Sequence, residues 1–265
     1  MSRRTLGTVV GAMLILFAGL TLILIRDGNN GRPRPPGTSR PSGASEVVSS
    51  GRCDNEEAVA LDEERRGEGS LEGDIDGDGS GDEAFVALDV EGAPEECRAF
   101  LVIQRTDGIW SLPIGNPATP YDLGYPRLNS LANVDGRSGL DIVVDVIAGA
   151  STQFAGVYTM DGGVLAHVRL RGGPPLQDGL VPYGGSVGHL DAADCVPEEG
   201  PGTIVVSRAL PAEAETTYEV VRRLYRYFAR AELVLDQEAT ETQLTPDPGS
   251  FREYRASPFG SCPRL

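Results

Sequence analysis

The sequence predicts an all-β fold of repeated units, each with about four short strands, preceded by one transmembrane helix. Three observations support this prediction. A loop that contains aspartate and leads into a β-branched apolar strand occurs three times. A hairpin pattern follows each copy. A long apolar run lies near the N-terminus, so we expect one anchored β-domain.

The repeat is visible when three stretches are aligned: GDIDGDGSGDEAFVAL, ANVDGRSGLDIVVDV and GHLDAADCVPEEGPGTIVVS. In this alignment Asp76, Asp135 and Asp191 hold corresponding places, 59 and then 56 residues apart. Self-similarity at a nearly fixed period is typical of repeat architectures. We therefore expect three related structural units.

The hairpins are predicted from Asp-Gly turns between alternating apolar residues. RAFLVIQRTDGIWSLPI turns at Asp107 and GVYTMDGGVLAHVRL turns at Asp161. The third unit offers 217–237, in which Tyr218, Val221 and Tyr225 recur at a spacing that also fits an amphipathic helix. Because this segment occupies the place of the hairpin in the repeat, we predict two strands with a turn near 229–232.

Units of about 58 residues with four strands each are typical of propeller blades. Residues 53–265 hold between three and four such units, so we expect a small or incomplete propeller. A closed ring would leave no exposed strand edges.

The first loop has the richest set of metal-ligating side chains. Asp74, Asp76 and Asp78 stand at its first, third and fifth places, and Asp82 at the ninth. The intervening glycines permit the positive φ angles of a tightly wound loop. Carboxylates without nitrogen or sulfur ligands favour calcium over magnesium or manganese, and the Ser80 carbonyl at the seventh place is a further candidate ligand.

This loop is not an EF-hand, because Phe85 stands at the twelfth place and a strand follows where a helix is required. An Asp-x-Asp-x-Asp-Gly-x-x-Asp loop that ends at a strand resembles the FG-GAP or VCBS repeat family. That family includes the calcium loops of integrin α-subunit propellers and many bacterial surface proteins. The resemblance is close over 73–88 and loose over 132–145 and 188–207. It implies a calcium-binding β-propeller repeat with these ligands: Asp74, Asp76, Asp78, Ser80 and Asp82.

The other two loops lack the full ligand set. Asn133, Asp135 and Asp141 match the first, third and ninth places of the second loop, but Arg137 stands at the fifth. We expect this arginine to form a salt bridge with the remaining carboxylates and to leave no ion site. The third loop is interrupted by Cys195 and the insertion VPEEGPG, so we expect no ion there either.

A simpler interpretation of the first loop remains open. An Asp-Gly-rich loop can be only a solvated turn. If calcium binds, its expected role is to pin the loop and neutralise its charge, and the millimolar calcium outside cells would suffice for a weak site.

The four cysteines are Cys53, Cys97, Cys195 and Cys262. An even number in an exported chain indicates two disulfides, with three possible pairings. SPFGSCPRL echoes GGSVGHLDAADC one unit earlier, which would place Cys262 beside Cys195. The repeat therefore favours the pairs Cys195–Cys262 and Cys53–Cys97.

The N-terminal region predicts an anchor. Leu6 to Ile25 form an uncharged, mostly apolar run that matches the thickness of a bilayer core, after Arg3 and Arg4. A cleaved signal peptide is the alternative, although no small-x-small site follows. The expected parts are a cytoplasmic tail (1–4), a transmembrane signal anchor (5–26), a flexible Pro/Gly/Ser linker (27–50) and an extracellular repeat domain (51–265).

Composition excludes several mechanisms. All 23 basic residues are arginine, so no Schiff-base or phosphate-binding lysine exists. A net charge of -16 argues against a nucleic acid partner. No HExxH motif is present. The usage of Arg, Gly, Ala and Pro without lysine is typical of a GC-rich bacterium.

We therefore expect a non-enzymatic cell-surface domain, anchored in the cell membrane by a single pass, with a structural calcium ion. Its ligand is expected to be an extracellular protein or an envelope polymer such as a polysaccharide. Two alternatives stay open. One is an envelope hydrolase with an acidic, glycosidase-like site, suggested by the carboxylate-rich run 54–74. The other is a structural extracellular subunit of a membrane complex.

Overall fold

The computed structural model describes residues 66–88, 97–116, 118–176, 179–186, 188–212, 217–244 and 257–264. The predicted tail, signal anchor and linker (1–50) and Cys53 lie outside these residues. Within the described ranges, no helix has both the length and the apolar character needed to cross a membrane.

The described residues form strands and short 3-10 turns, which confirms the all-β prediction. The strands are β1 (Arg66–Gly73), β2 (Asp82–Leu88), β3 (Ala99–Arg105), β4 (Gly108–Pro113), β5 (Arg127–Ala132), β6 (Asp141–Ala148), β7 (Thr152–Asp161), β8 (Val164–His167), β9 (Arg169–Arg171), β10 (Val181–Ser186), β11 (His189–Cys195), β12 (Thr203–Pro211), β13 (Thr217–Tyr227) and β14 (Glu232–Leu244). The 3-10 turns are η2 (Tyr121–Leu123) and η4 (Pro197–Glu199).

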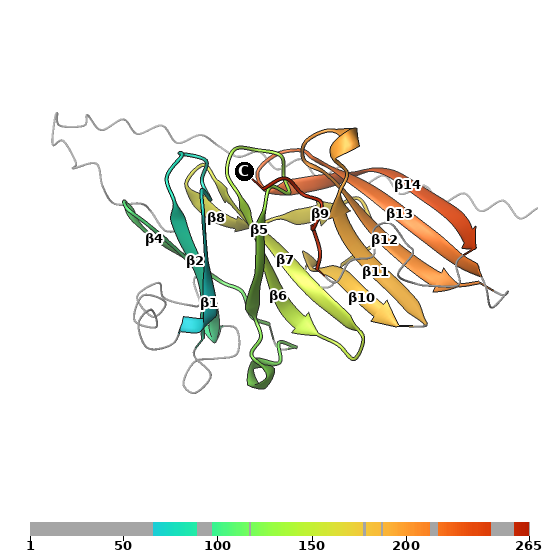
Figure 1. Ribbon diagram of the computed structural model, residues 1–265, viewed down its shortest axis with the longest axis horizontal. Helices are drawn as coiled ribbons and strands as arrows, with labels where there is room; N and C mark the ends of the chain where they lie inside the picture. Colours follow the sequence, from blue (N-terminus) through green and yellow to red (C-terminus); the bar gives the residue numbers. More distant parts are fainter. Residues whose placement is uncertain are drawn as a thin grey trace, which may run out of the picture. The chain divides into compact units, whose positions relative to one another are not determined.

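These strands make two sheets (Figure 1). The first sheet has four strands in the order β1-β2-β3-β4. The second has ten, in the order β5-β6-β7-β10-β11-β12-β13-β14-β9, with β8 paired to β7 beside this path. Three antiparallel meanders recur within the two sheets, namely β1 to β4, β5 to β8 and β11 to β14. The predicted unit of four strands is therefore present three times.

All three predicted hairpins form. Strands β3 and β4 pair around the Asp107 turn, and β7 and β8 pair after Asp161. The segment that also fitted a helix consists of β13 and β14, which pair from Tyr227↔Leu233 outward. Tyr218 and Tyr225 are buried in two different apolar clusters on these strands. The repeat was thus a better guide than the helical spacing.

The described residues form no closed ring, because both sheets are open. Strand β7 explains this arrangement. One of its edges pairs with β6, while the other pairs with β10 through Thr152–Ala155 and with β8 through Tyr158–Asp161. Strand β10 also pairs with β11. It therefore joins the second and third meanders into one continuous sheet instead of leaving them as separate blades.

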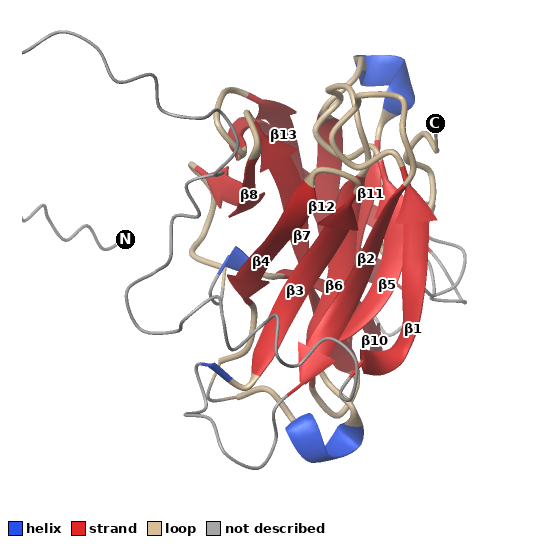
Figure 2. Ribbon diagram, turned by 90° about the vertical axis from the view of Figure 1, so that its left-hand side faces the viewer, coloured by secondary structure: helices blue, strands red, loops and turns tan. Residues whose placement is uncertain are grey.

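One of the two large cores lies between the first sheet and the second meander. Alternate residues of β2 and β3, such as Ala84 and Leu101, face Ile142 and Val144 of β6 in one buried cluster. Their neighbours, such as Phe85, form a smaller cluster on the opposite face of the first sheet. This period of two is the normal consequence of strand geometry. Figure 2 shows these strands side by side.

The loop between the first two strands of each meander contacts the corresponding loop of the next meander. The Leu140 N–H of the second loop donates to the Asp74 carbonyl of the first, at 2.8 Å. A Cβ on Gly136 of the second loop would overlap the backbone of Gly202 in the third. The three loops therefore lie at one end of the sheets as a contiguous group.

The predicted disulfide between Cys195 and Cys262 is present, with Cα atoms 4.9 Å apart. It ties the C-terminal segment 257–264 to the end of β11. The Asn133 N–H donates to the Pro263 carbonyl at 2.9 Å, so the same segment also reaches the second loop. Cys97 is disulfide-bonded as well. Its predicted partner, Cys53, is not among the described residues.

Candidate metal site

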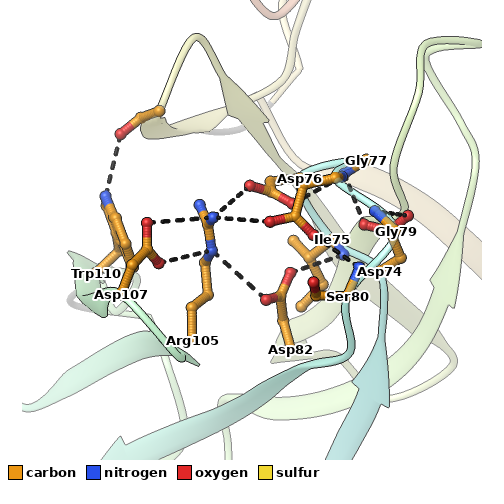
Figure 3. Close-up of polar contacts among 12 residues, drawn as sticks. Asp74, Ile75, Asp76, Gly77, Gly79, Ser80, Asp82, Arg105, Asp107 and Trp110 are labelled. Atoms are coloured by element: carbon orange, nitrogen blue, oxygen red, sulfur yellow. Dashed lines mark hydrogen bonds and ion pairs between the residues drawn. The ribbon is translucent and has the colours of Figure 1, made fainter.

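The first loop joins β1 to β2 and is wound by its own aspartates (Figure 3). Asp74 accepts hydrogen bonds from the Gly77 N–H at 2.8 Å and the Gly79 N–H at 3.1 Å. Asp76 accepts one from the Asp78 N–H at 3.1 Å. Such side-chain to backbone bonds form Asx turns, which suit Asp and favour a tight loop. Gly77 and Gly79 have φ angles of 79° and 87°, which glycine adopts without strain.

This winding brings three predicted ligands together. Asp74, Asp76 and Asp78 each offer one carboxylate oxygen, and these three oxygens all lie within 4.8 Å of one another. Hard oxygen ligands from neighbouring loop positions are what calcium requires. These three carboxylates could therefore hold a metal ion.

The two other predicted ligands lie differently. Asp82 is outside this group and is 3% exposed. Its Oδ2 accepts a hydrogen bond from the Ile75 N–H at 3.0 Å, which closes the loop. Desolvation raises the pKa of Asp82, and the hydrogen bond from the Ile75 N–H lowers it in part. Ser80 is exposed and its N–H donates to Asp78 Oδ1 at 2.7 Å. Ligation by its carbonyl remains a prediction.

Arg105, at the end of β3, is the residue that the sequence interpretation missed. Its Nη2 lies 2.6 Å from Asp76 Oδ2 and 3.4 Å from Asp78 Oδ2, and its Nε lies 3.5 Å from Asp82 Oδ1 (Figure 3). The side chain is only 11% exposed. Strands β2 and β3 pair at Glu83↔Gln104, so the next step of the register brings Arg105 opposite Asp82. The pairing register of β2 and β3 is the signal that could have placed Arg105 beside the loop.

Other contacts hold Arg105 in place. Its guanidinium lies over the Trp110 ring, 4.7 Å from the centroid, and its Nε lies 3.3 Å from Asp107 Oδ1. The pKa of Asp78 is lowered by hydrogen bonds from Ser80, the backbone N–H first, and by the charge of Arg105. The arginine thus balances part of the negative charge of the loop from inside the protein. A divalent cation on Asp76 and Asp78 would share these carboxylates with it.

The second loop confirms the predicted salt bridge. Arg137 Nε lies 2.7 Å from Asp135 Oδ2, and Arg137 Nη1 lies 2.8 Å from Asp161 Oδ1. Nη2 also donates to Thr159 Oγ1 at 2.9 Å. The guanidinium at the fifth place therefore neutralises the carboxylate at the third, as expected from the sequence.

Asp141 closes the second loop in the way that Asp82 closes the first. Its Oδ2 accepts hydrogen bonds from the Val134 N–H at 2.7 Å and the Asp135 N–H at 2.9 Å. Burial and the nearby charge of Asp135 raise the pKa of Asp141 to about 7. The ninth place of both loops thus holds a buried aspartate that accepts a backbone N–H from the start of the same loop.

The placement of Asp191 in the third loop is wrong. Asp191 lies within β11, where it is 3.7 Å from Arg208 Nε and 3.5 Å from His189 Nε2. Cys195 pairs with Ile204 in the same way that Gly73 pairs with Asp82, so the third loop begins after Cys195. The insertion and the loss of aspartates in this loop had shifted the alignment.

Comparison with known proteins gives no match. No family model matches the chain, and neither a curated protein nor a solved structure is similar to it. The resemblance to FG-GAP and VCBS repeats therefore depends on the loop residues alone and stays a prediction.

Proposed function

We propose that this chain is a non-enzymatic, membrane-anchored extracellular domain whose first loop binds a structural calcium ion. The observation that supports it most directly is the approach of three carboxylate oxygens, from Asp74, Asp76 and Asp78, to within 4.8 Å of one another. The three-fold repeat of the meander and its loop supports the FG-GAP-like interpretation.

A structural role follows from what the loop contacts. The Asp74 carbonyl accepts the Leu140 N–H, so fixing the first loop also fixes the second. The carboxylates of Asp74, Asp76 and Asp78 belong to a short connection between two strands and line neither of the two clefts described below. Calcium would therefore act by holding the ends of two meanders together.

Thermal unfolding of the full-length chain tests this proposal. At a calcium concentration of about 100 times Kd, binding to the native state stabilises it by about 2.7 kcal/mol. That corresponds to a rise in Tm of roughly 5–10 °C for a domain of this size. Asp76→Ala removes one ligand and is expected to lose most of the calcium-dependent rise. Asp122→Ala, an exposed aspartate outside the loop, is the matched control.

Unfolding in chelator provides the result that would contradict the proposal. An unmutated protein that melts at one temperature in calcium and in chelator has no calcium site in its native state. A rise in Tm that persists in Asp76→Ala would place the ion elsewhere. Magnesium at the same concentration is expected to give a smaller rise, because it prefers octahedral, water-rich coordination.

The proposed partner is an extracellular protein or an envelope polysaccharide, by analogy with surface proteins built from such repeats. Crosslinking on intact cells, followed by identification of the captured species, tests this part. Capture of membrane proteins alone would instead favour the structural subunit of a membrane complex.

One observation favours the hydrolase alternative, namely a cleft with acidic walls. It has a volume of about 500 Å³ and is lined by Asp194, Glu198, Glu199 and Glu241. These carboxylates have structural partners. Asp194 accepts the Ser261 N–H, Glu199 pairs with Arg226, and Glu241 pairs with Arg222.

The partners of these carboxylates favour a structural role over general acid-base catalysis, which needs two facing carboxyl groups about 5 to 10 Å apart. Hydrolysis of envelope polysaccharide that is lost in Glu198→Gln would reverse this preference.

A further inference from the structure

A cleft of about 530 Å³ lies where the first sheet meets the second. One wall is the end of β4 and the residues after it. The other is the β7–β8 hairpin together with β9 and the turn before β14. Strands β4 and β8 are neighbours here. The cleft shares no residue with the calcium loop or with the acidic cleft.

The inner part of this cleft is apolar. Leu165 and Leu180 are 7% and 3% exposed, and Ile114 is 5% exposed. Tyr158 forms part of the wall, with the His167 ring stacked on it at 5.0 Å between centroids. Val164, at 43% exposed, is an apolar residue of the cleft that faces solvent. A cavity of this volume with apolar walls suits a small molecule.

The outer part carries positive charge. Arg169 and Arg230 line the cleft and are exposed, and neither forms an ion pair or a side-chain hydrogen bond within the part of the chain that the structure describes. Glu232, the acidic residue of the lining, is held by Arg171 at 2.6 Å. The described lining residues therefore carry a net positive charge, in a chain whose net charge is -16. A net positive charge at a cleft attracts anions.

The backbone at this wall is also unusual. Arg230 and Ala231 have φ angles of 49° and 57°, a region that residues other than glycine rarely adopt. Ala231 is 3% exposed, and its carbonyl accepts the Arg169 N–H at 2.8 Å. Arg230 and Ala231 are the two central residues of the β13–β14 turn, which the Glu232 N–H closes by donating to the Ala229 carbonyl at 3.0 Å, and a type I′ hairpin turn requires positive φ at both. This turn places the two unpaired arginines on one wall.

We propose that this cleft binds a small organic acid, with an apolar body against Leu165, Leu180 and Tyr158 and a carboxylate at Arg169 and Arg230. Arginine is suited to this role because its planar guanidinium donates two parallel hydrogen bonds to a carboxylate. The volume of the cleft, about 530 Å³, suits a small molecule.

A matched pair of ligands tests the charge requirement. Calorimetric titration of the full-length chain in detergent compares 4-phenylbutyrate with its neutral amide, 4-phenylbutyramide, each against a detergent blank. The acid is expected to bind at least about tenfold more tightly than the amide, which is the effect of one charge-assisted interaction. Equal affinities for the two, or no binding of the acid up to about 10 mM, would overturn the proposal.

Variants locate the binding. Arg230→Gln and Arg169→Gln are each expected to weaken the acid by roughly tenfold and to leave the amide unchanged. Arg264→Gln is the matched control, because Arg264 is exposed and does not line the cleft. Val164→Trp fills the cleft from an exposed strand position and is expected to abolish binding of both ligands. Folded variants, checked by circular dichroism, that bind the acid like the unmutated protein would contradict the assignment.

Discussion

In the loop between β1 and β2, Asp82 accepts a hydrogen bond from the Ile75 N–H, and in the loop between β5 and β6, Asp141 accepts one from the Val134 N–H. Both bonds span seven residues. The ninth place of each loop is therefore a cap that belongs to the fold, whether or not a metal ion is present.

The first and fifth places differ between the same two loops. Asp74 accepts the N–H groups of Gly77 and Gly79, whereas the equivalent Asn133 donates its side-chain N–H to the Gly139 carbonyl at 3.0 Å. The fifth place is Asp78 in one loop and Arg137 in the other.

This difference changes the source of positive charge. In the second loop Arg137 lies within the loop itself, while in the first Arg105 reaches in from β3. A loop with its own guanidinium has a permanent cation. When the guanidinium comes from a neighbouring strand, as Arg105 does, the loop keeps an additional carboxylate that can bind a metal ion.

Gly136 provides the largest expected effect, because it joins the second loop to the third. Its φ angle is 76°, and an added Cβ would overlap the backbone of Gly202. Gly136→Ala is expected to lower the free energy of unfolding by roughly 3 kcal/mol or more, from the left-handed conformation and the overlap together. Urea denaturation measures it.

Gly79→Ala is the matched control in the first loop. Gly79 has a φ angle of 87°, but an added Cβ would meet no atom within 4 Å. The expected loss is therefore only about 1–2 kcal/mol, from the conformation alone. Similar losses at Gly79 and Gly136 would show that the loops do not support each other through this contact.

The two arginines give the next largest effect and separate the loops by their response to calcium. Arg137→Gln leaves Asp135, whose side chain is 3% exposed, without its cation. We expect a loss of about 2 kcal/mol, below the value for a fully buried pair because Arg137 is 25% exposed. Calcium is not expected to restore it.

Arg105→Gln removes the borrowed cation of the first loop. In chelator, a loss of about 2 kcal/mol is expected for the same reason. In calcium, most of this loss is expected to be regained, since the ion no longer competes with a guanidinium for Asp76. Thermal unfolding of both variants in calcium and in chelator measures this contrast. If calcium changed the stability of both variants equally, the proposed difference in metal binding between the two loops would be wrong.

Local patterns predicted much of this fold. Asp-Gly turns located the β3–β4 and β7–β8 hairpins, the repeat located the β13–β14 hairpin, and the echo around Cys262 located its disulfide with Cys195. The salt bridge of Arg137 was also predictable, because the arginine and Asp135 are two residues apart in one loop. In each case the signal lies within a short segment or in the comparison of repeats.

Contacts between segments were not predictable in the same way. Arg105 reaches the first loop through the register of β2 and β3, which composition does not specify. The open second sheet depends on β10, whose hydrogen bonds to both β7 and β11 are a matter of packing between units. Asp191 was misplaced because the third loop had lost the aspartates that would align it.

The smallest expected effect concerns pH and compares the capping aspartate of the second loop with its neutral analogue. Burial raises the pKa of Asp141 from 3.8 to about 7, so between these values the folded state binds a proton that the unfolded state has released. Stability from this group is therefore present below about pH 4 and is lost as the pH rises towards 7. Asp141→Asn keeps an oxygen that can accept the Val134 N–H but does not titrate.

Relative to the unmutated protein, Asp141→Asn is expected to gain about 1 kcal/mol between pH 5 and pH 8, or roughly 2–4 °C in Tm. The gain is limited because the neutral amide loses the charge-assisted strength of two hydrogen bonds. Asp122→Asn controls for the loss of one surface charge. Parallel Tm curves for Asp141→Asn and the unmutated protein across this range would mean that the second loop tolerates an ionised cap, as a loop built to hold its own cation could.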